Sequence, residues 1–186
     1  QLREIEERAF AAGVSAADLM DEAGTGIAEV VTQFYPSPGA LVLYLGKGNN
    51  AGDALVAARV LIEKGWRVFA RLALTEADFK PLPKLHWETL RERVTLISRR
   101  DPFPATRGTA VLLDGLVGIG AQGPLGADLV PLAEEMNTLR RWRHAHVIAM
   151  DIPSGLDGDT GEPQEVCVEA DVTAPVSRVK IRILSE

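Results

Sequence analysis

Three glycine-rich segments of the sequence combine backbone amides with short polar side chains, a combination that can hold a phosphorylated small molecule. These segments are 46–53, 114–120 and 151–155, each after a short apolar run. Glycine lets backbone N–H groups approach an anion closely, and a helix start behind such a loop adds partial positive charge. Asn49, Asn50 and Asp53 add donors and acceptors to the first segment. One such loop could be only a tight strand-to-helix turn, but three at equivalent positions favour a ligand site.

Two aspartates, Asp114 and Asp151, come directly after apolar runs. Because ligands bind outside the carboxyl ends of the strands in an open α/β sheet, we expect both carboxylates at a ligand-binding edge. Each could simply cap the next turn, or, partly screened from water, have a raised pKa and serve as a general acid or base. One carboxylate with backbone, Asn and Ser oxygens would also suit a hard monovalent cation, whereas softer metals prefer nitrogen and sulfur ligands.

Two better-known nucleotide motifs fit the sequence poorly. Gly46, Gly48 and Ala51 match the dinucleotide pattern G-x-G-x-x-G/A, but no acid closes the next predicted strand, and the first one after it is Glu76. A hydride-transferring dehydrogenase is therefore not well supported. A Walker A site is excluded because no Gly-Lys-Ser/Thr follows the loop. The segment 157–161 hints at a calcium loop but fails on spacing, so a turn is the better interpretation.

The remaining reactive side chains carry weak signals. Ser154 has no G-x-S-x-G around it, and the histidines His86, His144 and His146 are not at metal-pair spacing. Cys167 is expected to be a packed or inert thiol, because no nearby charge pattern would activate it.

Helical and strand-like segments alternate along the chain. Helical spacing predicts helices at 2–12, from a Ser15 cap to Phe34, and at 53–64, 84–93 and 129–142, while short apolar runs predict strands at 40–45, 67–74, 94–97, 109–114, 146–151, 170–173 and 179–184. This alternation predicts one α/β domain over residues 1–186, with a three-layer Rossmann-like fold: a mostly parallel central sheet and helices on both faces.

Composition excludes several classes of partner. The chain has 26 acidic and 20 basic side chains, a net charge of −6 that argues against a nucleic-acid or anionic-membrane binder. No apolar run approaches the ~20 residues that span a bilayer. The single cysteine fits a reducing compartment, so we expect a cytoplasmic protein. The chain begins with Gln1 rather than Met, which leaves an earlier organellar transit peptide open.

The three loops together resemble the YjeF N-terminal domain family, the NAD(P)H-hydrate epimerases. The family's phosphate-side loop reads close to G-x-G-N-N-G-G-D-G, and residues 46–54 read G-K-G-N-N-A-G-D-A. The strongest match is A-M-D-I-P-S-G-L-D-G-D-T-G over 149–161. Further matches, in the right order, are 19–24, 56–61, and 114–120 with Pro124 and Leu125.

This resemblance implies a repair enzyme that interconverts the R and S forms of hydrated NADH and NADPH, with Asp151 as the acid/base catalyst. The residues it implies as substrate contacts are Asn49, Asn50, Ala51, Gly52, Asp53, Gly118, Ile119, Gly120, Ala121, Gln122, Gly123, Pro124 and Asp151. It also implies one potassium ion per subunit, at Asn50, Asp114 and Ser154. A homodimer is expected, with the first two helices as its surface. An NAD(P)H-hydrate dehydratase is expected as a fused domain or a working partner.

The sequence also departs from the family pattern. Ala51 and Ala54 replace glycines, which could narrow the backbone approach to the ligand, and Gly123 stands where the family usually has an arginine. The family pattern is shortened near Ala174 and Pro175, so residues are expected to be missing there. These departures keep a non-catalytic nucleotide-binding or scaffold domain of the same fold as the alternative.

Overall fold

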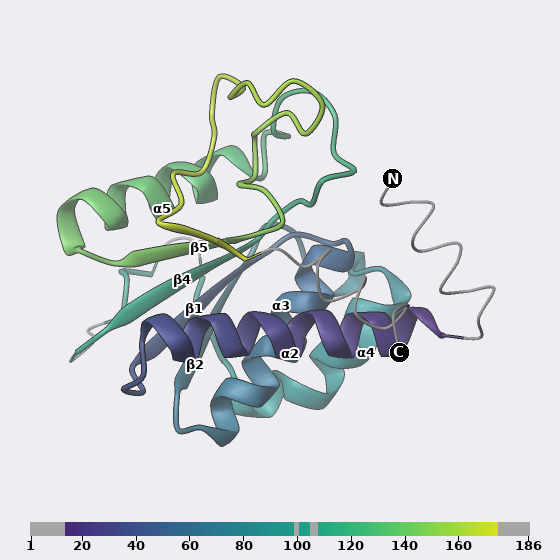
Figure 1. Ribbon diagram of the computed structural model, residues 1–186, viewed down its shortest axis with the longest axis vertical. Helices are drawn as coiled ribbons and strands as arrows, with labels where there is room; N and C mark the ends of the chain where they lie inside the picture. The colour runs from purple at the N-terminus through teal and green to yellow at the C-terminus, as the bar shows by residue number, and fades with distance from the viewer. Residues whose placement is uncertain (1–13, 99–100, 105–107, 175–186) are drawn as a thin grey trace.

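A parallel β-sheet forms the middle layer of the molecule (Figure 1). The computed structural model describes residues 14–98, 101–104 and 108–174. Within those residues the strands are β1 (Ala40–Leu45), β2 (Arg67–Leu72), β3 (Thr95–Leu96), β4 (Ala110–Gly115), β5 (His146–Met150) and β6 (Val172–Ala174). Their order is β3-β2-β1-β4-β5-β6, with every pairing parallel. This is the doubly wound order of dinucleotide-binding folds, so the predicted fold class is confirmed.

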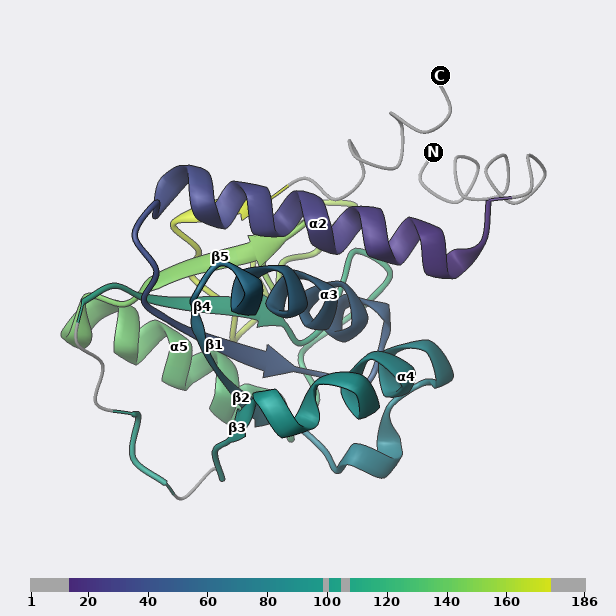
Figure 2. The same cartoon turned by 90° about the horizontal axis from the view of Figure 1, so that it is seen from below.

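Helices cover both faces of the sheet (Figure 2). One face carries α2 (Ala16–Phe34), α3 (Asn49–Glu63) and α4 (Pro81–Leu90), and the other carries α5 (Val130–Arg143). Short 3-10 helices, η1 (Glu76–Asp78) and η2 (Arg91–Arg93), flank α4. Successive strand residues alternate between two apolar cores, as the pleat requires: Leu43 packs on the α2–α4 side, and Val42 packs on the α5 side. Over the described residues no helix is both long and apolar enough to cross a membrane.

Helix α2 begins at a capping box, as the sequence predicts. The hydroxyl oxygen of Ser15 accepts a hydrogen bond from Asp18 N, and the Asp18 carboxylate accepts from the backbone N–H and the hydroxyl of Ser15. The apolar stripe of α2 is buried against α3, where a Cβ on Gly24 would lie only 2.4 Å from Val56 Cβ. The apolar stripe of α2 is therefore covered by the chain's own core, so only the other faces of this helix are left for the expected dimer surface.

The α5 face of the sheet holds one buried cation. The Arg71 side chain is 1% exposed, and its Nε lies 2.8 Å from a carboxylate oxygen of Glu135 on α5. The Arg71 guanidinium also donates to the carbonyl oxygens of Ser98 and Asp101. Arg71 lies opposite Tyr44 in the β1–β2 register, and the Tyr44 ring is buried beside it. The ion pair thus joins β2 to α5, and the two hydrogen bonds join β2 to the chain after β3.

Several predicted boundaries need correction. Helix α3 begins at Asn49 rather than Asp53, because Gly48 supplies the extended N-cap and the two asparagines occupy the first turn. Helix α4 begins at Pro81 rather than Lys84, since proline's fixed φ suits a first helical turn. Strand β2 stops at Leu72 rather than Leu74. The predicted helix at 2–12, the strand at 179–184 and the expected gap at Pro175 lie outside the described residues.

Candidate active site at the carboxyl edge of the sheet

The register of the sheet brings the predicted loops together. Leu45 pairs with Gly115 across β1 and β4, and Asp114 pairs with Ala149 across β4 and β5. The chain therefore leaves these three strands along a single edge. The loops after β4 and β5 rise from this edge together (Figure 1).

Asp114 and Ser154 form a buried polar contact at this edge, and both side chains are 0% exposed. Ser154 Oγ donates to Asp114 Oδ1 at 2.6 Å, and Ser154 N donates to Asp114 Oδ2 at 2.7 Å. Leu116 N also donates to Oδ1, at 3.3 Å. Burial raises the pKa of the Asp114 carboxyl to about 6, although these hydrogen bonds lower it in part.

The Val117 peptide joins this pair to Asn50. Val117 N donates to Ser154 Oγ at 3.1 Å, and Val117 O accepts from Asn50 Nδ2 at 2.8 Å. Asn50 in the first turn of α3, Asp114 near the end of β4 and Ser154 in the loop after β5 are thus brought together around one peptide group. The atoms that these three residues could offer to a metal ion are oxygens, and a single carboxylate is among them. In the described part of the chain no group of three or more His, Cys, Asp or Glu side chains could hold a metal ion.

Asp151 lies immediately after β5 in an uncommon backbone conformation. Its φ is 60°, in the left-handed region that non-glycine residues adopt rarely. Asp151 N donates to Ala174 O at 2.8 Å, and Ile152 N donates to Met150 O at 2.7 Å, so the chain turns sharply at this residue. The residue is half-buried, at the edge from which the loop departs. Left-handed conformations of this kind cost free energy and gather at active sites.

The first predicted loop, 46–53, divides into an exposed part and a buried part. Asn49 is exposed and Asn50 is half-buried, whereas Asp53 is 6% exposed. The Ala51 side chain packs in the hydrophobic core, and a Cβ on Gly52 would lie 2.4 Å from Met20 Sδ. The Ala51 methyl therefore does not narrow the loop, and Ala51 and Gly52 can offer a ligand only their backbone.

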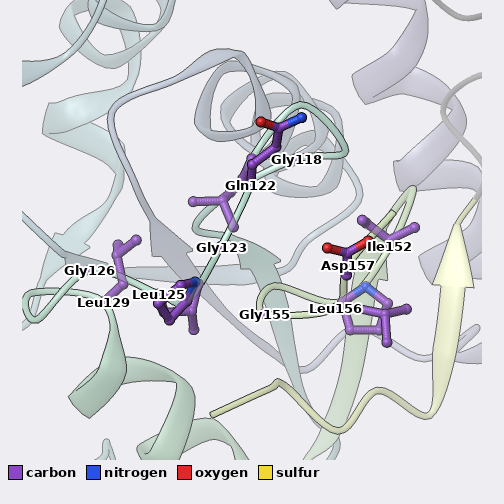
Figure 3. Close-up of a pocket in the computed structure, with 14 residues that line it drawn as sticks. Gly118, Gln122, Gly123, Leu125, Gly126, Leu129, Ile152, Gly155, Leu156 and Asp157 are labelled. Carbon is purple, nitrogen blue, oxygen red and sulfur yellow. The ribbon is translucent and has the colours of Figure 1, made fainter. Parts of the chain in front are cut away.

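A pocket opens between the loops after β4 and β5 (Figure 3). Its lining residues are Val117, Gly118, Ala121, Gln122, Gly123, Pro124, Leu125, Gly126, Leu129, Ile152, Pro153, Gly155, Leu156 and Asp157. Of the second predicted substrate loop, Ile119 and Gly120 do not line it, and the other members do. Gly123 has φ 76°, which an arginine at this position would adopt only with strain.

Sequence reasoning missed one side of this pocket. Leu125 and Leu129 lie before α5, and Ile152, Leu156 and Asp157 lie in the loop after β5. The alternation of strands and helices marks these segments as loops but does not show that they face each other. The sequence predicts a turn at Asp157, and this is confirmed: Asp157 Oδ1 accepts from Asp159 N and Thr160 N at 3.0 and 2.9 Å.

Fold and site together define a doubly wound α/β protein with a pocket at the carboxyl edge of its sheet. Residues 16–181 match the family described as YjeF-related protein N-terminus, and the chain belongs to this family. The chain is 34% identical over 163 residues to the NAD(P)H-hydrate epimerase of Bordetella bronchiseptica, covering 88% of this chain and 67% of that protein. It is 30% identical to the NAD(P)H-hydrate epimerase of Cenarchaeum symbiosum, covering 97% of this chain and 84% of that protein.

Some relatives are much longer. The bifunctional NAD(P)H-hydrate repair enzyme of Leishmania braziliensis is 31% identical over 191 residues, and the match covers 99% of this chain but only 33% of that protein. The chain thus spans about a third of such relatives. The crystal structure of a yeast protein, ynu0, superposes with a TM-score of 0.77 at 21% identity, covering 92% of this chain and 75% of that one. That likeness supports the fold.

Proposed function

We propose that this chain interconverts the R and S forms of hydrated NADH and NADPH. The observation that carries the proposal is the position of Asp151, a carboxylate in a left-handed turn at the strand edge, next to the pocket residues Ile152 and Pro153. The names of the relatives point to the same reaction. A dinucleotide is also the ligand that this strand order commonly binds at this edge.

The reaction needs proton transfers at a carbon that bears a hydroxyl group and adjoins the ring nitrogen. In the proposed mechanism, the carboxyl of Asp151 protonates the departing hydroxyl, while the nitrogen lone pair forms the C=N bond. Water then adds to the opposite face of that carbon and releases its proton to solvent, and the Asp151 carboxylate takes up a proton from solvent. No electrons are gained or lost over the cycle, and the acid is regenerated.

A potassium ion is proposed at Asn50, Asp114 and Ser154, and the donor set supports it. Asn50 Oδ1, the Asp114 carboxylate, Ser154 Oγ and the Val117 carbonyl supply only oxygen atoms, which suit a hard cation. The ion would contribute positive charge at the edge where the phosphates of the substrate lie. The chain's own contribution is the link between the start of α3 and the loops after β4 and β5, because Val117 is bonded to both Asn50 and Ser154.

The partners and the location of the protein are also proposals. We propose that it works with an NAD(P)H-hydrate dehydratase, as the bifunctional relatives suggest. A homodimer would need a surface other than the covered stripe of α2. A cytoplasmic location agrees with the free thiol of Cys167, whose pKa is raised by burial and by the nearby Asp114.

The decisive experiment couples this protein to an S-specific dehydratase. R-hydrated NADPH is supplied with the dehydratase and its nucleotide, and NADPH formation is followed by absorbance with and without the chain. The chain is expected to accelerate NADPH formation over spontaneous epimerisation, and no acceleration would reject the proposal. Asp151→Asn is expected to lose the acceleration while remaining folded, because asparagine tolerates the left-handed conformation. Asp159→Asn, in the same loop and exposed, is the matched control.

A further inference from the structure

The pocket between the two loops is poorly suited to a phosphate. Its walls carry the apolar side chains of Leu125 and Leu129 on one side and of Ile152 and Leu156 on the other, and polar surface as well. None of the described lining residues is basic, and the single charged one is Asp157. A pocket with this lining suits a flat, uncharged ring that carries a hydrogen-bond donor, while an anionic group would meet like charge.

Asp157 is held firmly in place by its own hairpin. Asp157 N donates to Glu162 O at 3.0 Å, and Gly161 N donates to Asp157 O at 2.8 Å. Leu156 and Pro163 form a bridge just outside this turn. The backbone that carries the Asp157 carboxylate is therefore fixed. Figure 3 shows this carboxylate across the pocket from Gln122 and Gly123.

The Asp157 carboxylate is ionised and retains acceptor capacity. Hydrogen bonds from Thr160 and Asp159 lower the pKa of its carboxyl below the usual value. The backbone bonds both reach Oδ1, and the Thr160 hydroxyl adds a third. An ionised carboxylate accepts about four hydrogen bonds, so at least one acceptor position is left for a ligand.

The pocket lies beside the proposed catalyst. Ile152 and Pro153, the two residues after Asp151, line it, as do Val117 and Gly118 beside Ser154. A substrate whose reacting carbon faces Asp151 would therefore place its ring in this pocket. The phosphates would lie outside it, towards the first turn of α3.

We infer that Asp157 recognises the amino group of the ring carboxamide in the substrate and rejects the corresponding ring carboxylate. The inference rests on the proposed function, since it assigns the reacting ring to this pocket. The carboxamide NH₂ donates to the free acceptor position of Asp157, while the apolar walls enclose the ring. A ring carboxylate would bring a second negative charge against Asp157, and the repulsion between the two like charges would weaken its binding.

The test compares two ring probes, the reduced (dihydropyridine) forms of nicotinamide mononucleotide and nicotinic acid mononucleotide, whose rings carry no positive charge, as inhibitors of the epimerase reaction. For the unmodified chain the amide is expected to inhibit at least about tenfold more strongly, since a hydrogen bond to a charged group contributes about 1.5–3 kcal/mol. In Asp157→Asn the two inhibition constants are expected to converge to within about threefold. Asparagine keeps the turn because its Oδ1 can accept the same backbone bonds.

The controls separate this inference from the proposed function. Asp159→Asn removes a charge two residues away without touching the pocket lining, and it should keep the preference of the unmodified chain. If the chain accelerates epimerisation but Asp157→Asn leaves the amide-to-acid ratio unchanged, the inference is overturned and the function stands. If the unmodified chain shows no acceleration, the proposed function fails first. In that case, equal binding of both probes by calorimetry overturns the inference as well, whereas a tenfold amide preference that Asp157→Asn abolishes supports it.

Discussion

Ser154 Oγ and Asp114 Oδ1 lie 2.6 Å apart, although 40 residues separate them in the chain, and neither side chain is exposed to solvent. The contact joins the end of β4 to the loop after β5. Because Ser154 N also donates to the other carboxylate oxygen, both oxygens of Asp114 are engaged by one residue. The loop that carries Asp151 is thus fixed to the centre of the sheet.

Ser154→Ala is expected to destabilise the protein. The change removes a donor to a buried carboxylate but keeps the backbone donor, so the expected loss is about 1–3 kcal/mol in the free energy of unfolding. Urea unfolding followed by circular dichroism measures this loss. Ser37→Ala, at an exposed serine, is the matched control and should change stability by less than about 0.5 kcal/mol. Equal midpoints for the two variants would show that the contact contributes nothing.

Potassium is expected to raise the melting temperature if the oxygen cluster binds it. An ion present at about a hundred times its dissociation constant stabilises the folded state by about 2.7 kcal/mol. The measurement compares thermal unfolding in potassium chloride with unfolding in tetramethylammonium chloride at equal ionic strength. Asp114→Asn should abolish the difference.

Asn50→Ala provides a second variant at the same cluster, in case Asp114→Asn folds poorly. Asn50 is only half-buried, so its replacement is the milder change. It should keep the fold and reduce the potassium effect. An identical potassium effect in the unmodified chain and in this variant would remove Asn50 from the ion site.

Gly46→Ala is expected to disturb the junction between β1 and β4. A Cβ at Gly46 would lie 1.9 Å from the carbonyl oxygen of Leu116, so the two chain segments must separate. Overpacking of this kind costs about 1–3 kcal/mol or more, measurable by urea unfolding. Gly48→Ala is the control in the same loop, because nothing lies within 4 Å of its Cβ position. The control should lose at most about 1 kcal/mol, and an equal loss for both variants would contradict the steric account.

The layers of the fold could be predicted because they follow from local patterns. The apolar run at Ala40–Leu45 gives strand β1 with the expected bounds, and Ser15 begins α2 through the expected cap. The start of α3 could not be placed, since asparagines favour turns as well as first helical positions. The glycines of this loop do not predict that the helix begins directly after Gly48.

The site was predictable only in part. The sequence predicts Asp114 and Asp151 at the sheet edge because each ends an apolar run. Only the family resemblance adds Asn50 and Ser154 to the predicted site. The pocket wall at Leu125, Leu129 and Leu156 depends on how two loops pack together. The sequence of one loop has no periodic pattern that indicates how far this loop lies from another loop. The same reason hides the pairing of Arg71 with Glu135, which are 64 positions apart in the chain.

The capping box of α2 predicts a dependence of stability on pH. Hydrogen bonds from the hydroxyl and the backbone N–H of Ser15 lower the pKa of Asp18 below 3.8. The stabilisation is therefore fully present above pH 3.8 and is lost as the pH falls through the lowered folded-state value. Asp18→Asn, which cannot ionise, should be less stable than the unmodified chain at pH 6. The gap should narrow as the pH falls below 3.8, and a gap that is independent of pH would contradict this role.

Arg71→Met is expected to be more damaging than removal of the whole ion pair. The single variant leaves the Glu135 carboxylate beside the buried Tyr44 ring without its cation. The loss should be smaller than the about 3–5 kcal/mol of a fully buried pair, because Glu135 is 28% exposed. The double variant Arg71→Met/Glu135→Leu leaves no uncompensated charge and should recover part of the loss. Glu135→Gln alone should cost less, because Arg71 still donates to the carbonyl oxygens of Ser98 and Asp101. Urea unfolding of Arg71→Met, Glu135→Leu and the double variant completes a double-mutant cycle, in which strictly additive losses would show that the two side chains do not interact.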